Sequence, residues 1–237
     1  MKKQSKTFYI FTAALTIAAV LLAINPINRR STNLLFIATI LALWACSIIL
    51  SWKNKMLRLI LFILPVILFS LLNLNGREID KEVIRSEYIK SLVKYDGTKY
   101  VWGGETSLGI DCSGLVRRGL IDTYIRLGFL NASPQYIRKG IYLWYNDLSA
   151  EAIGNEYNNL TVKILSNQIL NNIDHEKIRE GDIMVTENGV HTMAYIGNGN
   201  WIQADPSEHK VIIEKAPNDN NSWYKTPSKI LRWKELE

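Results

Sequence analysis

Cys112 lies in the stretch YVWGGETSLGIDCSGLVRR, residues 100–118, outside the strongly apolar N-terminal part of the chain. The sequence predicts a glycine-rich turn before it and a helix that begins at about this residue. Backbone N–H groups at a helix start favour an anion, so the thiolate form of the sulfur would be stabilised there. Cys112 could therefore act as a nucleophile. Alternatively, it is a small buried side chain beneath a helix cap formed by Asp111 or Ser113.

A nucleophilic thiol needs a base, and the chain offers three histidines. His175 lies in a polar segment and His209 in a turn, so both are expected to be exposed to solvent. His191 begins the apolar segment HTMAYIG, which is predicted to form a strand. A histidine there has packed neighbours that can fix its ring. His191 is therefore the candidate base, although a lone histidine at a strand start is more often structural.

A third polar group is expected to hold the imidazole by accepting its other N–H. Gln203 and Asp205 lie on the next predicted strand, beyond a turn at residues 198–200. A three-residue turn places His191 and Gln203 on the same face of the sheet, whereas a two-residue turn places them on opposite faces. Even in the favourable register they are not directly opposite, so coiling or a bulge is also required. Asp205 points to the same face as Gln203 and is the alternative partner of the imidazole.

The first third of the chain is predicted to be a membrane region, residues 1–76. It contains three largely apolar segments of about the length that crosses a bilayer, at residues 8–24, 34–50 and 57–74. The basic start Met1-Lys2-Lys3 would also suit a cleaved signal peptide, but no small-x-small cleavage site follows the first segment. Three retained spans are therefore expected, with two spans as the main alternative.

The formal net charge of +6 does not indicate binding to nucleic acid. Residues 1–76 contain eight Lys or Arg and no acidic residue, whereas the rest of the chain holds 20 of the 28 basic residues and all 22 acidic ones. The excess positive charge therefore flanks the membrane segments. Three cations precede the first span, two follow it and three follow the second, which favours an N-terminus inside the cell. With three spans, everything after residue 76 lies outside the cytoplasmic membrane; with two spans, it lies inside.

The two cysteines of the chain are not expected to form a disulfide. Cys46 lies within the second apolar segment, whereas Cys112 lies in the globular part. An environment outside the cytoplasm favours thiol oxidation. A single unpaired thiol in such a domain is therefore a feature that needs a functional explanation or deep burial.

The globular part, residues 77–237, is predicted to have an α+β fold with an antiparallel sheet. Helical spacing of apolar residues predicts helices over residues 77–95 and 115–130. Residues 131–176 are rich in Asn, Tyr and Ser and are expected to form an irregular or partly helical insertion at the surface. Strands are predicted over residues 182–186, 191–197, 201–204, 210–215 and 229–233.

Four sequence blocks taken together resemble the NlpC/P60 family of papain-like cysteine peptidases. They are YVWGG, GIDCSGLV, GDIMV and GVHTMAYIGNGNWIQA. The resemblance extends over residues 80–215 and is interrupted by the segment 131–176. It implies a papain-like α+β fold in which the nucleophile begins a central helix that packs on an antiparallel sheet.

The resemblance also implies roles for individual residues. Cys112 matches the family's nucleophile and His191 its general base. Gln203 occupies the position of the third polar residue, which is most often a histidine in the family, and it would orient the ring without adding charge. The backbone N–H of Cys112 is expected to contribute to an oxyanion hole. Three further residues match positions that line the subsite beside the scissile bond in relatives: Tyr100, Asp111 and Ser113.

The function that the resemblance implies is a membrane-anchored cysteine peptidase that hydrolyses amide bonds in the stem peptides of bacterial peptidoglycan. Neither a metal ion nor another cofactor is expected. Two alternatives remain: an amidase or acyltransferase of the same fold, since one thiol–imidazole pair serves both reactions, and a domain that only binds wall peptides. The expected partners are peptidoglycan stem peptides and the lipid bilayer. The expected location is the cell membrane, with the catalytic domain outside the cytoplasm.

Overall fold

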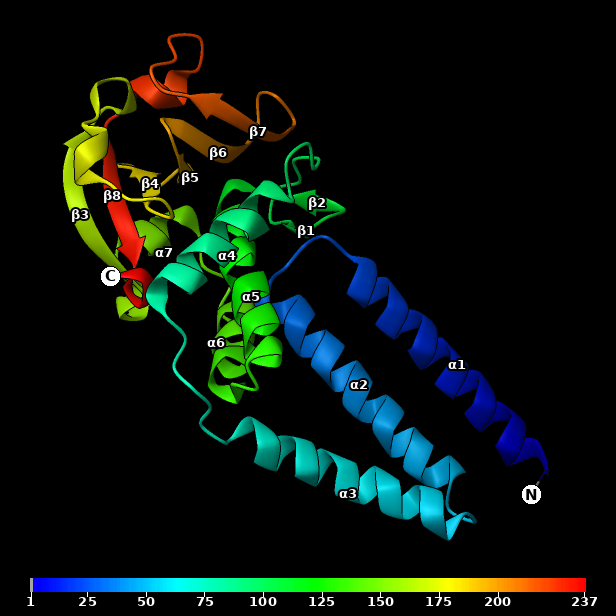
Figure 1. Cartoon of the computed structure of the whole chain (residues 1–237). Helices are drawn as coiled ribbons and strands as arrows, with labels where there is room; N and C mark the ends of the chain where they lie inside the picture. The colour runs from blue at the N-terminus through cyan, green and yellow to red at the C-terminus, as the bar shows by residue number, and fades with distance from the viewer. Residues whose placement is uncertain (1) are drawn as a thin grey trace.

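The computed structural model describes residues 2–237, with side-chain environments from Lys6 onward. Met1, part of the basic start noted above, lies outside the described residues. Three N-terminal helices extend away from one side of the globular part (Figure 1): α1 (Lys2–Ile24), α2 (Arg30–Leu50) and α3 (Lys55–Leu72). All three are long and apolar enough to cross a membrane, and their side chains are mostly exposed. They contain most of each of the three predicted spans, although α3 ends two residues earlier than expected.

The loop between α1 and α2 contacts the globular part, whereas the turn between α2 and α3 lies at the far end of the helices (Figure 1). If all three helices cross a membrane, this loop and the globular part lie on the same side of it, as the contact requires. If only α1 and α2 crossed, the loop and the globular part would lie on opposite sides. The contact is therefore compatible with three spans, or with α2 and α3 alone, but not with α1 and α2 alone.

The globular part contains a six-stranded antiparallel sheet in the order β3-β8-β4-β5-β6-β7. Its strands are β3 (Thr161–Gln168), β4 (Ile183–Thr186), β5 (Thr192–Gly197), β6 (Asn200–Asp205), β7 (Lys210–Lys215) and β8 (Ser228–Trp233). The five strands predicted from the sequence correspond to β4–β8, with every boundary within one residue. A separate small hairpin is formed by β1 (Glu105–Thr106) and β2 (Gly109–Ile110).

Helices cover this sheet, and the central one is α5 (Cys112–Leu130). The others are α4 (Lys81–Val93), α6 (Pro134–Tyr145) and α7 (Ala150–Gly154), together with the short 3-10 helices η1 (Tyr157–Asn159), η2 (Leu170–Asn172), η3 (His175–Lys177), η4 (Ser222–Lys225) and η5 (Lys234–Leu236). The buried residues Leu115 and Val116 of α5 lie in one apolar cluster with Ala194 of β5 and Ile202 of β6. This packing fixes the start of α5 against the middle of the sheet.

Residues 131–176 are more regular and more buried than the sequence indicates. They form α6, α7 and the edge strand β3, and side chains such as Tyr136, Leu143 and Ile153 lie in the main core. The expectation of a segment lying at the surface is therefore wrong for much of this region. Two register shifts interrupt the pairing of β3 with β8. They break the two-residue alternation by which a strand is recognised in a sequence.

We expect Asp182→Ala to destabilise the globular part. Asp182 precedes β4 and is fully buried, and both of its carboxylate oxygens accept hydrogen bonds from Arg232 of β8, at 2.7 and 2.8 Å. Removing one partner of a buried pair leaves an uncompensated charge and lowers the free energy of unfolding by about 3 kcal/mol or more. Thermal unfolding of the full-length protein in detergent should therefore begin several degrees lower.

The matched control is Lys177→Ala, which breaks an exposed ion pair with Asp174. Water already screens that pair, so the unfolding temperature should hardly change. Equal shifts for the two variants would contradict a stabilising role for the buried pair.

Candidate active site

The start of α5 is held by Asp111, which acts as its N-cap. One carboxylate oxygen, Oδ1, accepts hydrogen bonds from the Gly114 N–H at 2.6 Å and from the Ser113 hydroxyl at 3.0 Å. The other oxygen, Oδ2, accepts from the Gly103 N–H at 2.8 Å. Asp111 therefore joins the glycine-rich turn to the first turn of the helix. Because Cys112 lies between these two attachments, its backbone is fixed on both sides.

The approach of this turn to the helix requires glycine at position 114. A Cβ atom on Gly114 would lie 2.1 Å from the carbonyl oxygen of Gly104, a distance that no side chain tolerates. The glycine two residues after the cysteine is thus explained by close packing of backbone on backbone.

The Cys112 thiol is buried against the sheet, with 8% of the residue exposed. The backbone N–H of Thr192, the first residue of β5, favours the thiolate form of its sulfur. Burial raises the pKa of the Cys112 thiol to about 12, and the charge of Asp111 adds to this rise. The N–H groups of Thr192, Ser113 and Cys112 itself oppose it. The site therefore contains N–H groups that stabilise a thiolate, but burial also removes the water that would solvate the charged sulfur.

His191 lies directly before β5 and is 1% exposed. Its Nε2 atom lies 2.7 Å from Oε1 of Gln203, and its ring stacks on Trp223 with centroids 4.2 Å apart and an interplanar angle of 15°. Since an amide oxygen only accepts, the neutral imidazole carries its proton on Nε2 and its free electron pair on Nδ1. Burial lowers the pKa of His191 to about 4, against the raising effects of Gln203 and Asp205.

Gln203 is itself held by an acidic residue of the next strand. Its Nε2 donates to Oε2 of Glu214 at 3.0 Å, and the Asn221 amide donates both to that oxygen, at 2.7 Å, and to Asp205, at 3.0 Å. The second oxygen of Asp205 accepts from the backbone of the turn that follows it. It is thus Gln203 that bonds to the imidazole, whereas Asp205 supports the turn and the network behind it.

The register between β5 and β6 explains why Gln203 reaches the imidazole. The turn between them has two residues, because Gly197 pairs with Asn200. That turn alone would place His191 and Gln203 on opposite faces of the sheet. A bulge between Tyr195 and Gly197 shifts the pairing by one residue and returns both side chains to the same face. The turn is thus the shorter of the two considered, and it is the bulge, not a three-residue turn, that brings both side chains to one face.

The other predicted site residues also lie near the thiol. Tyr100 pairs with Ile110 in an isolated bridge, and the neighbouring Cys112, Asp111 and Asp205 add to the effect of burial in raising the pKa of its hydroxyl. The two remaining histidines are elsewhere: His175 is half-buried beside Tyr195 and His209 is exposed.

A cleft of about 660 Å³ opens in front of the thiol. Cys112, Asp111 and Ser113 line it, together with Trp102 and the start of α7. His191 is not among the lining residues, but its neighbour Val190 is. The cleft is also lined by three residues from the loop between α1 and α2: Asn28, Arg29 and Arg30.

Several residues of the site escape prediction from the sequence. Glu214 could have been found, because pairing of Gln203 with Ile212 places Glu214 on the same face as Gln203. Asn221 and Trp223 belong to a polar segment whose path no periodic pattern indicates. The sequence identifies Arg29 only as one of two cations between the first two apolar segments, and nothing in its spacing relates it to Cys112.

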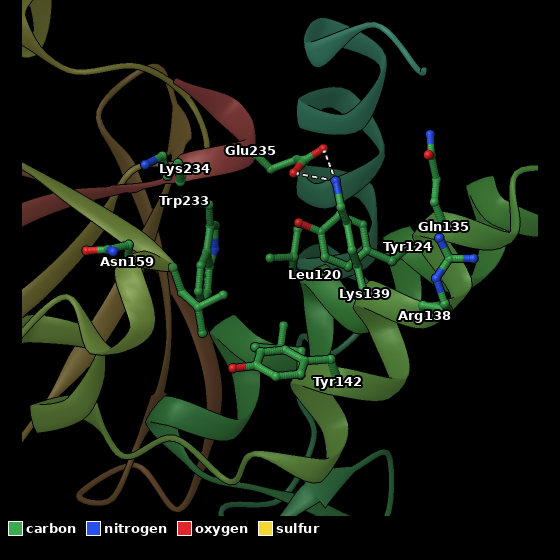
Figure 2. A pocket seen from close by; sticks show the side chains of 12 residues that line it. Leu120, Tyr124, Gln135, Arg138, Lys139, Tyr142, Asn159, Trp233, Lys234 and Glu235 are labelled. Carbon is green, nitrogen blue, oxygen red and sulfur yellow. Dashed lines mark hydrogen bonds and ion pairs between the residues drawn. The ribbon is translucent and has the colours of Figure 1, made fainter. Parts of the chain in front are cut away.

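A second cavity, of about 540 Å³, lies between α6 and the C-terminal residues (Figure 2). Tyr142 and Trp233 face it, and the ion pair of Lys139 with Glu235, at 2.7 Å, lies at its edge. None of the predicted site residues lines it. The cleft at Cys112 is therefore the candidate active site.

Comparison with solved structures finds several similar domains. The P60 domain of antigen MAP1204 from Mycobacterium avium subspecies paratuberculosis is 20% identical, with 67% of this chain and 99% of that chain covered and a TM-score of 0.41. The peptidoglycan hydrolase RipB from Mycobacterium tuberculosis is 20% identical, with 66% and 67% covered and a TM-score of 0.39. The NlpC/p60 domain of the peptidoglycan hydrolase SagA is 19% identical, with 62% and 96% covered and a TM-score of 0.35.

No match was found among curated proteins. The model of the NlpC/P60 family, in contrast, matches residues 97–232, which is more than half of the chain and includes the turn before Cys112, the central helix and the sheet up to β8. The α+β fold, with a helix that begins at Cys112 and packs on an antiparallel sheet, agrees with this match. The chain belongs to the NlpC/P60 family.

Proposed function

We propose that this protein is a membrane-anchored cysteine peptidase that hydrolyses amide bonds in peptidoglycan stem peptides. The observation that carries the proposal is the placement of one buried thiol, at a helix start, against the strand that begins beside a buried, hydrogen-bonded imidazole. In this proposal Cys112 is the nucleophile, His191 the general base and Gln203 the group that orients it. Membership of the NlpC/P60 family supports the substrate class.

The reaction starts with transfer of the thiol proton of Cys112 to Nδ1 of His191. The thiolate attacks the scissile carbonyl carbon, and the Cys112 N–H stabilises the developing oxyanion. The imidazolium then gives its proton to the leaving amine, which leaves an acyl-enzyme with a thioester bond. Water, deprotonated by His191, attacks the thioester and releases the new carboxylate and the thiol. In this proposal Asp111 and Ser113, which line the cleft, form the subsite beside the bond that breaks. Tyr100, which lies near Cys112 but is not among the residues that line the cleft, completes that subsite.

Burial favours this reaction through a neutral resting pair. A lone thiolate and a lone imidazolium are each disfavoured in the site, as the raised pKa of Cys112 and the lowered pKa of His191 indicate. Proton transfer from one to the other creates both charges at once, and they attract each other strongly where water is excluded.

The membrane helices determine where the reaction takes place. With three spans and an N-terminus inside the cell, the cleft faces the outside of the cytoplasmic membrane, where peptidoglycan lies. The contact between the α1–α2 loop and the globular part supports this topology, because it needs both on one side.

The direct test is incubation of the full-length protein in detergent with purified peptidoglycan. We expect fragments with new amine and carboxylate ends, detected by mass spectrometry. Cys112→Ala should lower the rate about 10³-fold or more, because it removes the nucleophile. Cys46→Ala is the matched control: Cys46 lies in α2, away from the cleft, and its loss should leave the rate unchanged. Undiminished release by Cys112→Ala would refute the proposal.

The role of His191 predicts a change in the pH dependence of thiol alkylation. In the wild type, we expect rapid alkylation across neutral pH and a loss of reactivity as the pH falls toward about 4, where His191 takes up a proton. In His191→Ala the thiol has no base and keeps the pKa that burial raises to about 12. Its alkylation should be slow at neutral pH and should rise with pH beyond pH 9.

The rates can be measured with iodoacetamide between about pH 4 and pH 11, monitored by the mass of the intact protein. His175→Ala, which removes an imidazole outside the site, should follow the wild-type profile. If His191→Ala also follows it, His191 is not the base.

The choice between Gln203 and Asp205 is tested by two variants. Gln203→Ala removes the acceptor of the imidazole Nε2–H, so the ring loses its fixed tautomer and kcat should fall about tenfold or more. Asp205→Asn keeps an oxygen for the turn and should retain most of the activity. A larger loss in Asp205→Asn than in Gln203→Ala would make Asp205 the orienting residue.

A further inference from the structure

The loop between α1 and α2, residues 25–30, is attached to the backbone of the turn that precedes Cys112; we call it the membrane loop. The Asn28 N–H donates to the carbonyl oxygen of Gly103 at 2.8 Å, and the Glu105 N–H donates to that of Pro26 at 2.8 Å. Ile27 pairs with Gly104 as an antiparallel bridge. The membrane loop thus lies along the same turn whose Gly103 N–H bonds to Asp111.

A buried polar side chain fixes the membrane loop in this place. Asn28 is 7% exposed, and its amide donates to the Glu105 carboxylate and, at 3.3 Å, to the carbonyl oxygen of Trp144. Glu105 in turn forms a buried ion pair with Arg117 of α5. Because buried polar groups are costly when they lose their partners, this network resists displacement of the loop.

As a consequence, two arginines of the membrane loop, Arg29 and Arg30, line the cleft. Arg29 and Arg30 are exposed, line the same cleft as Cys112, and form no ion pair among the described residues. The Arg30 guanidinium lies 5.2 Å from the ring centre of Tyr145 and donates to its hydroxyl at 3.4 Å. This contact gives the side chain a preferred position without neutralising its charge.

The acidic residues of the cleft do not neutralise these arginines. Asp111 is held by the backbone and by Ser113, and Asp147 is paired with the buried Arg117 at 2.8 Å. Glu151 also lines the cleft, but it is not within ion-pair distance of either arginine. The positive charge of Arg29 and Arg30 is thus available to a ligand in front of the thiol.

We propose that the membrane loop is one wall of the substrate cleft and that Arg29 and Arg30 bind a carboxylate of the substrate peptide. The proposal rests on the proposed function, because it names a subsite for that reaction. Guanidinium groups bind carboxylates through two parallel hydrogen bonds, which fixes both the position and the orientation of the partner. This subsite lies between the C-terminal end of α1 and the N-terminal end of α2. The substrate would therefore be bound close to the membrane surface.

The test compares two forms of one soluble stem peptide, the first with its free side carboxylates and the second with those carboxylates converted to amides. Full-length protein in neutral detergent is assayed as wild type and as Arg29→Ala/Arg30→Ala. On the carboxylate peptide, we expect the double variant to lose about ten- to a hundredfold in kcat/KM, mainly through KM. On the amide peptide, the double variant and the wild type should be equal within about twofold.

Two further variants serve as controls. Lys53→Ala/Lys55→Ala removes the same number of charges from the turn between α2 and α3 and from the first residue of α3, at the far end of the helices. This variant should behave as the wild type on both peptides. Arg29→Lys/Arg30→Lys keeps the charge but loses the planar fork, so it should recover only part of the loss.

The outcomes separate this subsite from other roles of the loop. Equal losses on both peptides would mean that the arginines only support the fold, and no loss on either would remove the subsite while leaving the proposed function intact. A loss that appears only in vesicles containing anionic lipid, whatever the charge of the peptide, would assign the arginines to lipid headgroups instead.

Failure of the proposed function itself would show as absence of hydrolysis by the wild type. In that case binding to Cys112→Ala is measured by calorimetry. Tighter binding of the carboxylate peptide than of the amide peptide, lost in Arg29→Ala/Arg30→Ala, would still support the subsite. Equal binding of the two peptides would overturn it.

Discussion

The exclusion of water from Cys112 and His191 is the constraint on which the rest of the site depends. Burial makes either charge costly alone, so the two groups are useful only if their positions are fixed well enough for a proton to pass between them. The chain fixes each one separately. Asp111 bonds both to the turn before α5 and to the first turn of that helix. The imidazole of His191 is hydrogen-bonded to Gln203 and stacked on the ring of Trp223.

The two halves of the site are brought together by different kinds of packing. The helix start depends on contacts of backbone with backbone, which is why Gly114 cannot carry a side chain. The strand side depends on register: a one-residue bulge in the β5–β6 pairing decides whether Gln203 faces the imidazole or the other face of the sheet. The membrane loop adds a third attachment, since Asn28 bonds to the turn before Cys112. The apolar N-terminal helices are therefore attached to the cleft through this loop, in addition to their covalent link with the globular part.

The sequence predicts those features that short-range patterns encode. Alternating apolar residues identify β4–β8, and the glycine turn followed by Asp111-Cys112-Ser113 identifies a helix start with a thiol at its first residue. The features it does not predict arise from contacts between distant residues. The bulges of β3 hide its alternation, and the packing of α6 on α5 buries aromatic residues that composition alone would assign to the surface. The contact of Asn28 with Glu105 spans 77 residues, and no local pattern records it.

The choice of a glutamine beside the imidazole follows from the same exclusion of water. A carboxylate in direct contact with His191 would stabilise the imidazolium, but it would also have to remain ionised where burial already lowers the pKa of the ring to about 4. Gln203 fixes the tautomer of the imidazole with a neutral acceptor, and its own amide N–H donates a hydrogen bond to Glu214. Glu214 is less buried and is further bonded to Asn218 and Asn221. The negative charge is thus held one residue away from the ring, where amides solvate it, and it still polarises the Gln203 amide that bonds to His191.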